Sequence, residues 1–121
     1  MFSTYREEEV MTMDGNIYLL QYGSYISKSV MEENIKNLNN YIIVEEDNKF
    51  YVYVGAFTSL SNAKKMQKSL ENKNIYTYLK NDYIGNTEII NKIKDLDKDI
   101  IQNEKKMEES NKQILEILKS M

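Results

Sequence analysis

One pattern occurs twice and decides the fold: Tyr18-Leu19-Leu20-Gln21-Tyr22-Gly23-Ser24-Tyr25 and, 32 residues later, Phe50-Tyr51-Val52-Tyr53-Val54-Gly55-Ala56-Phe57. Each copy alternates like a β-strand, reaches a glycine, and is followed by a serine-rich start and a helical pattern. Gly23 and Gly55 are expected to let the chain turn sharply where each strand ends. Because side chains alternate across a strand, one face is expected to meet a core and the other carries a polar and aromatic set. That second set is Leu19, Gln21, Tyr51 and Tyr53.

The rest of the two repeats completes an α+β fold. The element order β-α-β-β-α-β, with right-handed crossovers, predicts a four-stranded antiparallel sheet of ferredoxin/RNP-like topology. Both helices are expected on one face of the sheet, which leaves the other face open. The expected strands are Ile17–Tyr22, Tyr41–Val44, Phe50–Val54 and Ile75–Leu79, and the expected helix caps are Ser27 and either Ser59 or Ser61.

From residue 86 to residue 121 the pattern changes to an unbroken 4-3 spacing without Gly or Pro. This spacing predicts one long helix and is typical of a coiled-coil seam, with Asn103 and Ser110 as polar inserts. Two interpretations stay open: the seam pairs with another chain, or its first turns pack on the small domain. The apolar seam positions are Ile89, Ile93, Leu96, Ile100, Met107, Ile114 and Ile117.

These patterns divide the chain into three parts. Residues 1–15 form an acidic leader that is expected to be flexible, residues 16–80 form the domain, and residues 81–121 form the long helix. There is no long apolar run, so neither a transmembrane helix nor a signal peptide is predicted in this sequence.

Composition excludes several function classes. The chain has no Cys and no His, which removes thiolate chemistry, the commonest general base and the commonest transition-metal ligand. Residues 17–80 carry eight Lys against six acidic residues, too weak a positive charge to indicate nucleic-acid binding. The acidic run Glu45-Glu46-Asp47 is typical of a solvated hairpin turn. We therefore predict a protein without catalytic residues, metal site or cofactor.

The two copies also resemble a known family. Leu20-Gln21-Tyr22-Gly23-Ser24-Tyr25 is similar to the first-strand motif V-Q-x-G-S-F of the SPOR domain, and the copy at residues 50–57 is similar to its third-strand motif Y-R-V-x-V-G-P-F. The order and spacing of the two motifs agree as well. The resemblance covers about residues 16–80.

The resemblance implies a bacterial module that binds septal peptidoglycan strands stripped of their stem peptides. It implies a role in cell division or sporulation, on the extracytoplasmic side of the cell envelope, through an N-terminal anchor that this sequence does not include. In the family the ligand lies on the open sheet face, and the resemblance implicates Gln21 and Ser24 in binding.

The chemistry of the open face agrees with this expectation. Tyrosine rings present apolar area to the C–H faces of sugars, while phenol and amide groups exchange hydrogen bonds with hydroxyls. The competing interpretation is that the C-terminal helix covers the face and acts as a protein-interaction or scaffold element. Single-stranded RNA binding is disfavoured because the two central strands carry no Lys or Arg. The predicted glycan-binding residues are Gln21, Ser24, Tyr51, Tyr53, Tyr76 and Tyr78.

Overall fold

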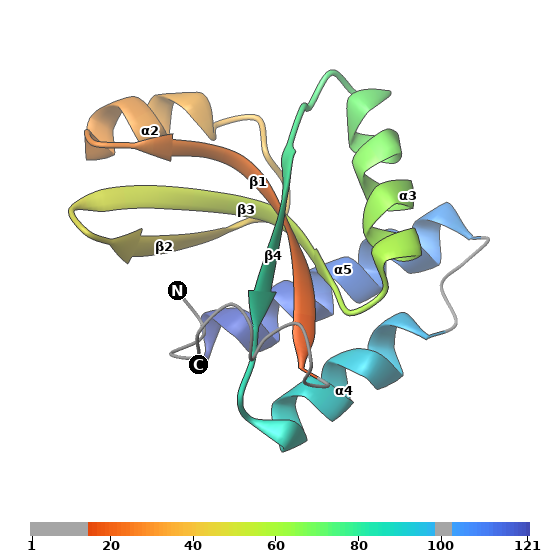
Figure 1. Ribbon diagram of the computed structural model, residues 1–121. Helices are drawn as coiled ribbons and strands as arrows, with labels where there is room; N and C mark the ends of the chain where they lie inside the picture. Colours follow the sequence, from red (N-terminus) through yellow and green to blue (C-terminus); the bar gives the residue numbers. More distant parts are fainter. Residues whose placement is uncertain (1–14, 99–102) are drawn as a thin grey trace.

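A computed structural model describes residues 15–98 and 103–121 (Figure 1). The predicted leader therefore lies outside the described residues, except for Gly15. The elements along the described chain are β1 (Asn16–Tyr25), α2 (Lys28–Asn34), β2 (Ile42–Glu46), β3 (Lys49–Phe57), α3 (Leu60–Glu71), β4 (Tyr78–Tyr83), α4 (Thr87–Asp97) and α5 (Glu104–Lys119).

The sheet confirms the predicted α+β class and topology. Its strand order is β2-β3-β1-β4, and each neighbouring pair is antiparallel, so the two repeated strands lie at its centre. The β2–β3 hairpin turns at Asp47 and Asn48, whose φ angles of 52° and 63° suit a two-residue turn with left-handed backbone at both positions. The predicted caps are also present, because Ser27 and Ser59 accept hydrogen bonds from the backbone N–H groups of Val30 and Asn62.

Helices cover both faces of the sheet. In Figure 1, α2 lies above the sheet and α3 to its right, whereas α4 lies below it and α5 passes behind it. On the α2 side, Met31 and Ile35 pack with Val52 of β3. On the opposite face Ile42 pairs with Tyr53, and both are buried in the core that includes Ile114 and Leu118 of α5.

The glycine-turn prediction is wrong. Gly23 lies inside β1 and Gly55 inside β3, and no described glycine has a positive φ angle. The glycines are needed for close packing. A Cβ on Gly55 would lie 2.7 Å from Cδ1 of Leu20, its partner across the sheet. Gly23 lies where the β1–β3 register shifts, at a bulge that lengthens β1 relative to its partner.

The prediction of one long C-terminal helix is also wrong. Asn103 has extended backbone (φ −121°, ψ 110°) and caps the N-terminus of α5, accepting a hydrogen bond from the Lys106 N–H at 3.1 Å. The seam spacing instead marks the side of α4 and α5 that faces the chain's own core. Of the predicted seam, Ile100 lies outside the described residues. Ile93, Met107 and Ile114 are buried in the core, and Ile89, Leu96 and Ile117 are partly buried against it.

The fourth strand begins later than predicted. After α3, Asn74 has left-handed backbone (φ 63°), and the Ile75 N–H donates a hydrogen bond to the Leu70 carbonyl. Residues 72–77 therefore form the C-terminal end of α3 and the connection to β4, and not a strand. The strand then runs over Tyr78–Tyr83, and the predicted domain boundary between residues 80 and 81 falls inside it. The helices beyond that boundary share the core of the sheet.

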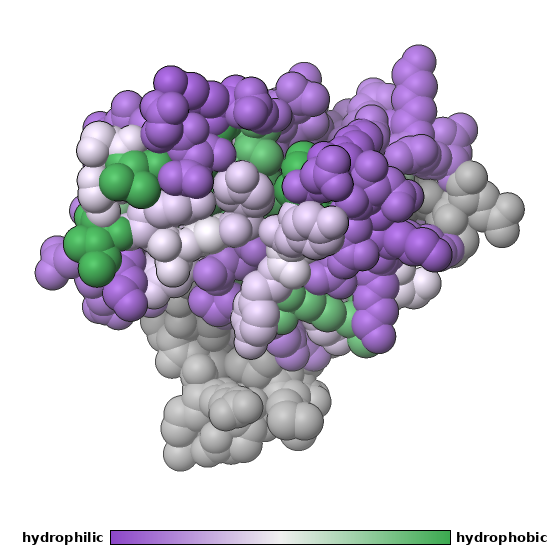
Figure 2. All heavy atoms as spheres, turned by 90° about the horizontal axis from the view of Figure 1, so that it is seen from above, coloured by the Kyte–Doolittle hydropathy of each residue, from purple (hydrophilic) through white to green (hydrophobic). Residues whose placement is uncertain are grey.

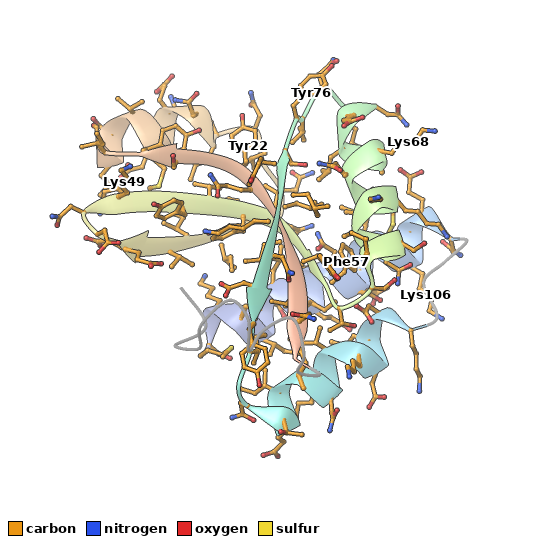
Figure 3. The ribbon with its side chains drawn as sticks, viewed as in Figure 1. Tyr22, Lys49, Phe57, Lys68, Tyr76 and Lys106 are labelled. Carbon is orange, nitrogen blue, oxygen red and sulfur yellow. The ribbon has the colours of Figure 1, made fainter. Side chains whose placement is uncertain are left out.

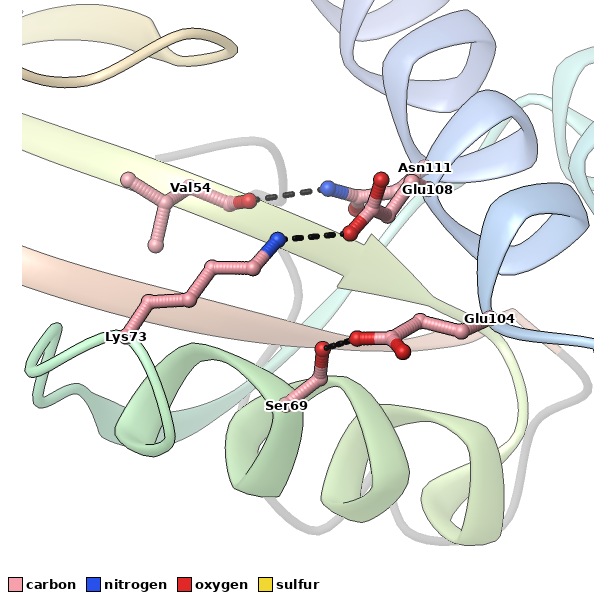
Figure 4. A network of polar contacts seen from close by, with 6 residues as sticks. All are labelled: Val54, Ser69, Lys73, Glu104, Glu108 and Asn111. Atoms are coloured by element: carbon pink, nitrogen blue, oxygen red, sulfur yellow. Dashed lines mark hydrogen bonds and ion pairs between the residues drawn. The ribbon is translucent and has the colours of Figure 1, made fainter.

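Polar contacts hold α5 against β3 and α3 (Figure 4). The buried Asn111 side chain donates to the Val54 carbonyl at 2.9 Å and accepts from the Ala56 N–H at 3.1 Å. Pairing with β2 ends at Tyr53, so Asn111 satisfies the next two edge groups of β3. Towards α3, Ser69 donates to Glu104 at 2.6 Å and Lys73 pairs with Glu108 at 2.7 Å.

Asn111→Ala is expected to lower the free energy of unfolding by about 2–4 kcal/mol, because two buried backbone groups lose their partner. Lys73→Ala is the control: it removes an ion pair whose side chains are 53% and 37% exposed, and such pairs contribute at most about 1 kcal/mol. Urea unfolding measures both. Equal losses for the two variants would contradict the role given to Asn111.

Gly55→Ala is expected to cost about 1–3 kcal/mol, because Leu20 is fully buried and cannot move away from a new methyl group. Gly23→Ala should cost less, since its Cβ would meet the hydroxyl end of the half-buried Tyr25 side chain, which can rotate. Thermal unfolding of the two variants compares them. A larger loss for Gly23→Ala would show that its backbone geometry matters more than packing.

Candidate functional site

The strand register brings the predicted site residues of the sheet to one face. Residues directly opposite in an antiparallel pair point to the same side. Gln21 lies opposite both Tyr53 and Tyr78, Ser24 lies opposite Tyr51, and Leu19 lies opposite Lys80. We call this side of the sheet the tyrosine face, and its members are Leu19, Gln21, Ser24, Tyr51, Tyr53, Tyr78 and Lys80.

Tyr53 is buried, not open to a ligand. Its side chain has no exposed area and belongs to the same core cluster as Ile114 and Leu118 of α5. The expectation of an entirely open face is therefore wrong, and its competitor, cover by the C-terminal segment, describes this part of the face. Burial, and then the negative charges of Asp82 and Glu46, raise the pKa of Tyr53 above its usual range.

The other predicted residues stay accessible to different degrees. Ser24 is exposed, Tyr78 is 68% exposed, and Gln21 and Tyr51 are half-buried. Tyr76 is 66% exposed, but it lies in the connection before β4 rather than in the sheet (Figure 3). A contiguous part of the face is thus built by the Gln21–Tyr78 and Ser24–Tyr51 pairs.

Lys80 is a member of the face that the sequence analysis missed. Its Nζ lies 5.2 Å from the Tyr51 ring centroid and 5.9 Å from the Tyr53 ring centroid. It also donates a hydrogen bond to the Tyr53 hydroxyl at 3.4 Å. The alternation of side chains along a strand puts Lys80 on the same face as Tyr76 and Tyr78, but the predicted strand ends at Leu79, one residue before Lys80.

The surface on the α2 side offers a poorer candidate. Seen from above, it is mostly hydrophilic with small separate hydrophobic areas (Figure 2). Among the exposed apolar residues, Ile26 precedes α2 and Val30 lies in its first turn. Single exposed apolar residues are normal on protein surfaces and do not identify a site.

Other kinds of site find no support in the described part of the chain. Within residues 15–98 and 103–121, no group of three or more acidic side chains is placed to hold a metal ion. In the same residues, no helix is long and apolar enough to cross a membrane.

Tyr53→Ala is expected to lower the free energy of unfolding by about 3–5 kcal/mol, as for other large aromatic residues removed from a core. Tyr78→Ala, on the same face but exposed, should change it by no more than about 0.5 kcal/mol. Chemical denaturation monitored by circular dichroism distinguishes the two. A mild effect of Tyr53→Ala would mean that its ring is not part of the core.

Comparison with known proteins found one matching family and a similar solved structure. The family model of the SPOR domain matches residues 46–92, an interval that runs from the end of β2 into α4 and includes β3 and β4. The first-strand motif lies outside it. The solution structure of the peptidoglycan binding domain of the B. subtilis cell wall lytic enzyme CwlC is similar at 20% identity and a TM-score of 0.48, over 59% of this chain and 95% of that one. No curated protein sequence matches the chain. The family match confirms the resemblance that the strand motifs indicated, with residues 46–92 matching the model of the SPOR domain.

Proposed function

We propose that this chain is a non-catalytic peptidoglycan-binding module and that glycan strands lie on the accessible part of the tyrosine face. The observation that carries the proposal is the register, which aligns Gln21 with Tyr78 and Ser24 with Tyr51 on one side of the sheet. Two tyrosine rings, an amide and a hydroxyl are thereby presented by three adjacent strands.

This set of groups suits a sugar chain. The exposed ring of Tyr78 and the half-buried ring of Tyr51 offer flat apolar area to pyranose C–H groups. The Gln21 amide and the Ser24 hydroxyl can both donate and accept, which sugar hydroxyls require. The strands are rigid elements, so little conformational entropy is lost when a ligand binds.

The family match supports the same assignment. It includes β3 and β4, which carry Tyr51, Tyr78 and Lys80. By resemblance to SPOR domains, the ligand would be septal strands stripped of stem peptides. The module would act in division or sporulation, on the extracytoplasmic side of the envelope, by holding its protein where such strands accumulate.

The composition supports a binding role rather than catalysis. The chain contains neither His nor Cys. The acidic run Glu45-Glu46-Asp47 lies at the β2–β3 turn, where Glu45 and Asp47 are exposed. Acid–base catalysis needs side chains held in fixed positions, which a solvated hairpin turn does not provide.

The scaffold alternative requires an exposed seam on the C-terminal helices. A partner helix would need the 4-3 seam, but Ile93, Met107 and Ile114 are buried in the chain's own core. Pairing through them would require α4 and α5 to leave the sheet. We therefore do not adopt this alternative.

Co-sedimentation with purified sacculi tests the proposal. We expect the chain to pellet with sacculi, and more strongly after an amidase has removed the stem peptides. Gln21→Ala combined with Tyr78→Ala should weaken binding at least about tenfold, because aromatic contacts at the centre of an interface contribute most of its energy.

Tyr41→Ala is the matched control, since Tyr41 is 37% exposed but lies outside the tyrosine face. It should pellet like the parent, and circular dichroism should show that all variants remain folded. Undiminished pelleting of the folded double variant would refute the site. Absence of pelleting by the parent would refute the function.

A further inference from the structure

The Lys80 side chain crosses the middle of the tyrosine face. The strand order places β1 between β4 and β3, yet Lys80 of β4 reaches Tyr51 and Tyr53 of β3. Its aliphatic part therefore passes over β1. The ammonium group ends beside the Tyr51 ring, close to the accessible pair formed by Ser24 and Tyr51.

The Lys80 ammonium group has N–H donors that its hydrogen bond to Tyr53 does not use. A lysine ammonium has three N–H donors, and one of them is used in the hydrogen bond to the Tyr53 hydroxyl. None of the ion pairs found among residues 15–98 and 103–121 involves Lys80. Asp82 follows on the same face and Glu46 lies across the sheet, and each of these carboxylates has an interaction partner.

The two rings hold the charge in place without neutralising it. A cation over a tyrosine face is attracted by the ring quadrupole and keeps its full charge. Because Tyr53 is immobilised in the core, its hydroxyl gives the Lys80 ammonium a fixed position. A half-buried cation that is held in this way is suited to an anionic group on a ligand.

We propose that Lys80 is a specificity-determining residue that recognises a carboxylate on the bound glycan. This inference rests on the proposed function. In peptidoglycan, the lactyl group of each muramic acid carries a free carboxylate only where the stem peptide has been removed. Where the peptide is attached, the same carbon forms a neutral amide. Lys80 thus distinguishes stripped strands from substituted ones by charge.

The experiment compares two ligands that differ only at this group. One is a tetrasaccharide of alternating N-acetylglucosamine and N-acetylmuramic acid with free lactyl carboxylates, and the other carries the corresponding methylamides. Calorimetric titration should show that the parent binds the carboxylate form about three- to tenfold more tightly, as expected for a partly exposed ion pair. The preference should shrink as salt concentration rises.

Substitutions then assign the preference to Lys80. Lys80→Gln should bind both tetrasaccharides with the affinity that the parent has for the methylamide, whereas Lys80→Arg should keep the preference. Lys68→Gln, an exposed lysine of α3, is the matched control and should behave like the parent. Thermal unfolding checks that each variant is folded. A lysine that served only to support the Tyr53 ring would change stability but leave the ligand preference unchanged.

The outcomes separate the two proposals. Equal binding of both tetrasaccharides by the parent, or an unchanged preference in folded Lys80→Gln, would overturn the role of Lys80 and leave glycan binding standing. Binding of neither tetrasaccharide, together with no pelleting with sacculi, would overturn both.

Discussion

The position of α5 along the edge of β3 depends on one buried side chain, Asn111. The pairing between β2 and β3 extends only as far as Tyr53, whereas β3 continues to Phe57. The backbone N–H and C=O groups on this edge of β3 beyond Tyr53 therefore need other partners inside the protein. The Asn111 amide supplies both partners, one donor and one acceptor, at Val54 and Ala56. An apolar residue at this position could fill the space but could not form hydrogen bonds with these two backbone groups of β3. The contact therefore specifies where along the β3 edge α5 docks, which apolar packing alone would leave less well defined.

Docking of α5 divides the tyrosine face into two parts with different roles. Tyr53 joins the core with Ile42 and Ile114, whereas Tyr51, Ser24 and Gln21 remain partly or fully accessible. A sheet with helices on both faces has little surface for a ligand, so the accessible part is the end of the sheet that carries Tyr78 and Ser24. The same helices that remove one predicted contact residue stabilise the strands that present the others.

Local patterns predicted the sheet well and the C-terminal region poorly, for a physical reason. Alternation, caps at Ser27 and Ser59, and the polar hairpin turn are properties of neighbouring residues, and the order of four strands follows from them. A 4-3 spacing states which side of a helix is buried but not what buries it, and the chain's own sheet serves as well as a second helix. The spacing alone predicts Asn103 as a polar insert of the seam, but asparagine is equally favoured as an N-cap, which is its position in α5. The burial of Tyr53 and the reach of Lys80 depend on contacts between distant segments, which no local pattern encodes.

Tyr53 connects the packing of the core to the chemistry of the face. Its ring lies in the cluster that α5 completes, and its hydroxyl is the acceptor that positions the Lys80 ammonium. Movement of α5 away from the sheet would free the ring, and the lysine would lose its fixed acceptor and part of its cation–π contact. A charge that must be ordered on binding contributes less affinity than one already in place. The helices beyond the repeat would therefore contribute to the affinity of the proposed binding site, although their core-facing side chains lie beneath it.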